Sequence, residues 1–145
     1  MRGCNCGYPG RSSIKMAFDV DEAWEFLLRH GAVHTVRPAS WYMARAPITS
    51  TAVGVHLHRG GKWTGHEATK VAVASGRGQA GLEQMMQQFL QTSGFGSVAD
   101  WLAKLVSMHG RQLTTVHWII YAVSGLKQHE SVGAQAEGVD DAQEA

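Results

Sequence analysis

The run from Leu113 to Val123 constrains the fold more than any other feature of this sequence. It is rich in β-branched and aromatic residues, and the apolar residues fall on both sides of an extended chain, as Trp118 and Ile120 do opposite Ile119. This pattern predicts a central strand that is buried on both faces. A chain of 145 residues with 44% hydrophobic residues can build one ordinary core around it, so we expect a single domain.

The rest of the chain divides into helical and extended segments. A helix is predicted from Asp19, which has Glu22 three residues on in a capping-box relation, to Gly31. Alternating apolar and polar residues predict three strands, with a turn at 59–62: 32–37, 51–58 and 67–75. Helical spacing predicts two further helices on either side of a break at 93–96: 82–90 and 97–109, the second capped by Ser97.

This order of elements, with few strands and peripheral helices, favours an α+β fold with a small, partly open β-barrel over a doubly wound sheet. We expect residues 1–17 to be a flexible leader, because they are rich in Gly, Ser and Arg without periodicity. Residues 18–125 should form the domain. Residues 126–145 should be a disordered acidic tail.

Charge is unevenly distributed, although the net charge is only +1. Five of the twelve acids lie between Gln128 and Ala145, which carries no Lys or Arg. Between Arg29 and Arg77, by contrast, seven basic residues accompany one acid, Glu67. A basic segment of this kind is typical of a surface that binds phosphate.

Short motifs in both halves of the chain resemble the ASCH domains of the PUA-like superfamily. The first is Gly31-x-x-x-Thr35-x-Arg37, just after the predicted helix, and the second is the stretch 93–101 followed by the aromatic last strand. The resemblance covers about residues 20–124. It implies a PUA-like, ASCH-type β-barrel with a cleft beside the first motif, and a role in binding RNA or modified nucleosides.

Some members of that family are hydrolases that remove an acetyl group from acetylcytidine with a Lys, a Thr and a Glu. Thr35 matches the threonine, but no lysine stands between Arg29 and Arg37, and the glutamate position falls near Ser93 and Gly94. We therefore expect binding rather than catalysis. A small amidohydrolase-type enzyme acting on a modified nucleoside is the alternative.

The catalytic candidates of that alternative are Thr35 and Glu67. Thr35 would act as nucleophile or polariser, with His34, His66 or Glu67 as general base. Glu67 could instead be a charge partner for Lys62 or Lys70.

The residues predicted to bind nucleic acid are cations interleaved with an aromatic ring. Phosphate groups attract Arg and Lys, and an unpaired base stacks on an aromatic face for ~1 to 3 kcal/mol. We expect one basic cleft that binds RNA or a nucleotide and is lined by six side chains: Thr35, Arg37, Arg45, Arg59, Lys62 and Trp63.

A metal-binding β-barrel is a second alternative, because His56 and His58 share one side of a predicted strand and His34 or His66 could approach them. No acid lies close to this pair in the sequence, so we expect neither a metal nor another cofactor.

The sequence predicts a cytoplasmic protein without a membrane segment. Cys4 and Cys6 are the only cysteines, and a bridge across one intervening residue would be strained, which favours a reducing compartment. No apolar run reaches the ~18 residues of a membrane span. The oligomeric state is left open.

Overall fold

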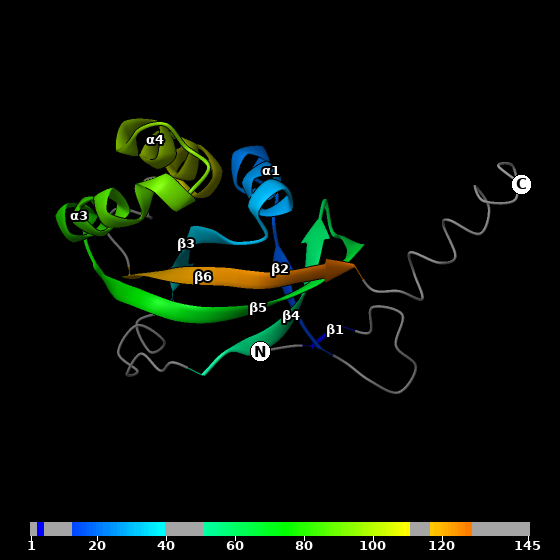
Figure 1. The fold of residues 1–145 in the computed structure, drawn as a ribbon. Helices are drawn as coiled ribbons and strands as arrows, with labels where there is room; N and C mark the ends of the chain where they lie inside the picture. Colours follow the sequence, from blue (N-terminus) through cyan, green and yellow to red (C-terminus); the bar gives the residue numbers. More distant parts are fainter. Residues whose placement is uncertain (1–2, 5–12, 40–50, 111–116, 129–145) are drawn as a thin grey trace, which may run out of the picture.

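The computed structural model describes residues 3–4, 13–39, 51–110 and 117–128. Within them, a mixed and curled sheet forms a half-barrel with helices packed against it (Figure 1). Its strands are β1 (Gly3–Cys4), β2 (Ser13–Ala17), β3 (Val33–Ala39), β4 (Val53–Arg59), β5 (Lys62–Arg77) and β6 (His117–Gln128). The helical elements are α1 (Asp21–His30), α3 (Gln79–Phe89), the short 3-10 helix η1 (Leu90–Thr92) and α4 (Val98–His109). The predicted α+β class and partly open barrel are confirmed at this level.

The last strand, β6, lies inside the sheet, as its sequence predicts. The strand order is β1-β2-β4-β5-β6-β3, and β6 is antiparallel to both β5 and β3, whereas β2 and β4 are parallel. The consecutive residues Trp118, Ile119 and Ile120 are all at most 5% exposed, so both faces of β6 are covered. In the described part of the chain, β3 has no strand on its other side and is an edge of the sheet.

Two apolar clusters lie on opposite faces of β3 and β6. The first packs Leu27 of α1 against Val33 and Val123. The second packs α3 and α4 against Val36 and Ile120. Because successive residues of a strand point to opposite sides, these two pairs lie on opposite faces. We call the face that carries Val33 and Val123 the inner face of the half-barrel.

The N-cap of the first helix lies one residue later than predicted and makes no side-chain cap. α1 starts at Asp21, and its N-cap residue, Val20, supplies no side-chain cap. Asp19 Oδ1 instead accepts a hydrogen bond of 2.7 Å from the backbone N–H of Gly60 in the β4–β5 turn. The capping-box prediction is therefore wrong, because a distant backbone donor takes the carboxylate. At the other predicted cap, Ser97 does accept from the N–H of Asp100.

The boundaries of several predicted segments also change. The leader is shorter than expected, because residues 13–17 form β2 and pair with β4. β6 extends to Gln128, beyond the expected end of the domain. β5 begins at Lys62 rather than near 67, after a tight turn in which Gly60 and Gly61 both have positive φ. The predicted loop 39–50, apart from Ala39 in β3, and the acidic tail beyond Gln128 lie outside the described residues.

Among the described residues, no helix is both long enough and apolar enough to cross a bilayer.

Candidate functional site

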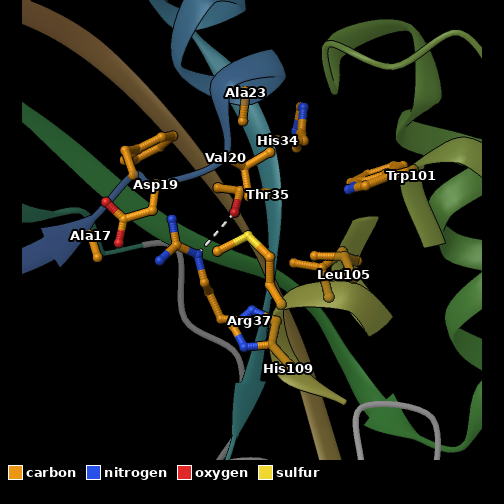
Figure 2. A pocket seen from close by; sticks show the side chains of 13 residues that line it. Ala17, Asp19, Val20, Ala23, His34, Thr35, Arg37, Trp101, Leu105 and His109 are labelled. Atoms are coloured by element: carbon orange, nitrogen blue, oxygen red, sulfur yellow. Dashed lines mark hydrogen bonds between the residues drawn. The ribbon is translucent and has the colours of Figure 1, made fainter. Parts of the chain in front are cut away.

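A pocket lies at the free edge of β3. The half-barrel does not close there, and the gap is bounded by the segment that joins β2 to α1 and by the second half of α4 (Figure 2). The cavity volume is about 100 Å³, which is room for a small anionic group, and its mouth opens to solvent. The lining residues come from three parts of the chain: 17–20 with Ala23, 34–37, and α4 through Trp101, Leu105, Met108 and His109.

Thr35 and Arg37 form the polar centre of this pocket. They are two residues apart on β3, so both side chains lie on the inner face with Val33. Arg37 Nε donates a hydrogen bond of 3.0 Å to Thr35 Oγ1, and the guanidinium lies 5.1 Å from the centre of the Phe18 ring. Figure 2 shows the guanidinium directed towards Asp19 at one wall of the pocket.

The charge of Arg37 is held in an enclosed position. The residue keeps part of its surface exposed, but its guanidinium is surrounded by protein, and burial lowers the pKa of Arg37 to about 10. Tyr121 and Asp19 act in the opposite direction. Arg37 therefore remains a cation at neutral pH. Among the described residues it forms no ion pair and donates one hydrogen bond, from Nε to Thr35, so none of these residues occupies its terminal N–H groups.

The donors of the pocket suit an anion. Thr35 Oγ1 accepts from Arg37, and a threonine hydroxyl also has one O–H to donate. An arginine presents several N–H donors in a planar fork that matches the oxygens of a phosphate or carboxylate. Phe18, Leu105 and Met108 add apolar walls. The arrangement can therefore hold a ligand with an anionic group at one end and an apolar body.

Two histidines also line the pocket, and His109 was not among the predicted site residues. Burial and the charge of Arg37 both lower the pKa of His109, which makes it neutral at pH 7. His34 points to the opposite side of β3 from Thr35, where Nδ1 lies 2.6 Å from Thr92 Oγ1 and the ring stacks on Phe89 at 4.5 Å. Nothing in the sequence places His109 near Arg37, because that proximity depends on how α4 packs.

The structure does not gather the other predicted cations around this pocket. Arg59 forms an ion pair of 2.5 Å with Asp21 and lies over the ring of Trp24. Lys62 is exposed at the start of β5. Neither residue lines the pocket. The structure therefore does not bring these two residues together with Thr35 and Arg37 in this pocket, and Arg45 lies outside the described residues.

Trp63 also lies away from the pocket. It belongs to β5 rather than to a polar turn, and its ring stacks on His56 at 4.5 Å with an interplanar angle of 6°. Its Nε1–H donates to the carbonyl oxygen of His66 at 3.0 Å. The indole is thus half-buried and held by contacts within β4 and β5, and it does not line the pocket of Arg37.

The two alternative chemistries lack their predicted geometry. Glu67 faces His56 in the β4–β5 register and does not line the pocket, so it is not placed as a base for Thr35. The ring of His66 packs edge-on against Trp24. For the metal alternative, the described ranges contain no group of three or more His, Cys, Asp or Glu side chains that could hold an ion.

The histidines predict a loss of stability in mild acid. The pKa values of His34, His58 and His109 are all lowered from 6.5, with burial as the largest cause. The unfolded chain then binds more protons than the folded one below about pH 6.5, so the free energy of unfolding is greatest above that pH and falls towards pH 5. Urea denaturation at pH 7.5, 6.5 and 5.5 measures this, and an unchanged midpoint would contradict it.

Comparisons with family models, with curated proteins and with solved structures find no match for this chain.

Proposed function

We propose that the protein binds a nucleotide, either free or as an unpaired unit of RNA, with the phosphate at Arg37 and Thr35. The observation that carries this proposal is the enclosed guanidinium of Arg37, which faces a pocket without an ion-pair partner among the described residues. Asp19 attracts this charge without forming an ion pair with it, and a bound anion in direct contact would offset more of the cost of burying the guanidinium. The position of the pocket beside Gly31-x-x-x-Thr35-x-Arg37 agrees with the cleft that the ASCH resemblance implies.

A single nucleotide fits this site better than a length of RNA backbone. A backbone-binding groove needs several cations along one path, but Arg59 is neutralised by Asp21 and does not border the pocket. The pocket offers one cation together with apolar side chains, including Phe18 and Met108, that can contact a base or a ribose. The specificity would then come from pocket shape more than from overall charge.

Calorimetric titration with AMP, CMP and adenosine tests the proposal. AMP and CMP should bind, and adenosine should bind at least about tenfold more weakly, because it lacks the group that Arg37 holds. Arg59→Gln is the matched control, since it removes a guanidinium that lies outside the pocket, and it should leave AMP binding unchanged. Equal binding of adenosine and AMP, or no binding of either nucleotide, would contradict the proposal. An octamer of uridylate that binds tightly only when Arg59 and Lys62 are present would point to backbone recognition instead.

A further inference from the structure

Lys70 and Tyr121 lie on the inner face beside Thr35 and Arg37. Tyr121 is directly opposite Thr35 in the β3–β6 pair, and Lys70 is opposite Val123 in the β5–β6 pair. Residues directly opposite each other in neighbouring strands present their side chains on the same face. Three adjacent strands, β3, β6 and β5, therefore bring a guanidinium, a phenol and an ammonium group to one side of the sheet.

A β-bulge in β5 changes which residues of that strand face the inner side of the sheet. The register with β6 shifts between Ala72 and Ala74, so that Ala72 pairs with Tyr121 whereas Ala74 pairs with Ile120. The extra residue turns the side chains that follow it to the other face. Ala74 accordingly joins the apolar cluster under α3 and α4, and Lys70, before the bulge, stays on the inner face.

Among the described residues Lys70 has no ion-pair partner, whereas Arg37 has the carboxylate of Asp19 nearby. Lys70 Nζ lies 4.5 Å from the centre of the Tyr121 ring, and both residues are half-buried. Burial lowers the pKa of Lys70, and the charge of Arg37 on the same face lowers it further. Burial raises the pKa of the Tyr121 hydroxyl, so it stays protonated and can donate. In the described part of the chain Lys70, like Arg37, forms no ion pair.

We propose that Lys70 and Tyr121 bind a second anionic group on the inner face, next to the group held by Arg37, so that the site takes a nucleoside diphosphate in preference to a monophosphate. This inference rests on the proposed function. Two partly buried cations repel each other and are poorly hydrated, and an anion between them relieves both costs. A ligand with two linked anionic groups would contact Arg37 with one and Lys70 with the other.

Titration of AMP, ADP and inorganic pyrophosphate in EDTA tests this inference. The intact protein should bind ADP at least about tenfold more tightly than AMP, which corresponds to ~1.4 kcal/mol. Lys70→Gln should remove most of that difference. Lys62→Gln is the matched control, because it removes the same charge from the exposed start of the same strand, and it should preserve the difference. Tyr121→Phe retains the ring under Lys70 and should weaken ADP binding by a smaller factor.

The outcomes separate the two proposals. If AMP binds and depends on Arg37 but ADP binds no better, the inner-face site is wrong and the nucleotide pocket stands. The same conclusion follows if Lys62→Gln and Lys70→Gln lower ADP affinity equally, because the effect is then one of net charge. If AMP does not bind but pyrophosphate does and depends on Lys70, the nucleotide proposal fails and the inner-face anion site stands. Thermal denaturation of Lys70→Gln should show an unchanged or higher midpoint, which excludes misfolding as the cause.

Discussion

Replacing Arg37 with methionine is expected to abolish nucleotide binding without destabilising the protein. The loss should be at least about thirtyfold in Kd for AMP, since removing one partner of an enclosed charge pair costs ~2 kcal/mol or more. Stability should be unchanged or higher, because a guanidinium whose one hydrogen bond goes to Thr35 is replaced by an apolar chain that can pack beside Phe18. Calorimetric titration and thermal denaturation of the same samples measure both effects.

Arg37→Lys provides the matched control for this experiment. Lysine keeps the charge but loses the planar fork, so AMP affinity should fall between that of the intact protein and that of Arg37→Met. A marked drop in the melting temperature of Arg37→Met would overturn the interpretation, since it would mean that the arginine supports the fold. The pKa of His109, followed by NMR, should rise in Arg37→Met, because the positive charge that helps to lower it is gone.

Gly94→Ala is expected to be the most destabilising small substitution in the described region. Gly94 has φ of +92°, a conformation that other residues adopt only with strain. A Cβ atom there would lie 2.5 Å from the backbone oxygen of Glu22 and 3.2 Å from Cβ of Phe26. Backbone strain and overpacking together should lower the free energy of unfolding by about 3 kcal/mol. Urea denaturation measures the change.

Gly96→Ala is the control two residues away. A Cβ at Gly96 meets no atom within 4 Å, and its φ is not positive, so the change should remain within about 0.5 kcal/mol. Similar losses for the two variants would show that the close approach to α1 is unimportant. Gly94 lies against α1, just before α4 begins. Residues of α1 and α4 line the pocket, so Gly94→Ala should also disturb the pocket.

Local patterns in the sequence were sufficient for much of the fold. The apolar run that contains Trp118 and Ile120 predicted a strand buried on both faces, and β6 is such a strand. The cap at Ser97 is also found as predicted, because it depends on residues a few positions apart. The prediction at Asp19 failed because the competing donor, Gly60, is distant in the chain.

In the candidate site, too, the arrangement of neighbouring residues could be predicted, whereas contacts with distant residues could not. Thr35 and Arg37 were predicted to act together because of the motif Gly31-x-x-x-Thr35-x-Arg37. In the structure they share one face of β3 and line the pocket with a hydrogen bond between them. Arg59 was assigned to the same cleft from its charge, but charge in a sequence does not say which acid a side chain meets. In the structure Arg59 forms an ion pair with Asp21 and does not line the pocket.

The sequence by itself determined the α+β class and the central strand, since both follow from periodicity along the chain. Only the tertiary structure decided that β3 is an edge, that α4 brings His109 to Arg37, and that a bulge in β5 turns Ala74 to the face opposite Lys70. These features arise from contacts between segments far apart in the chain. The energies of these contacts depend on strand register and side-chain packing, and neither can be predicted from a local pattern of residues.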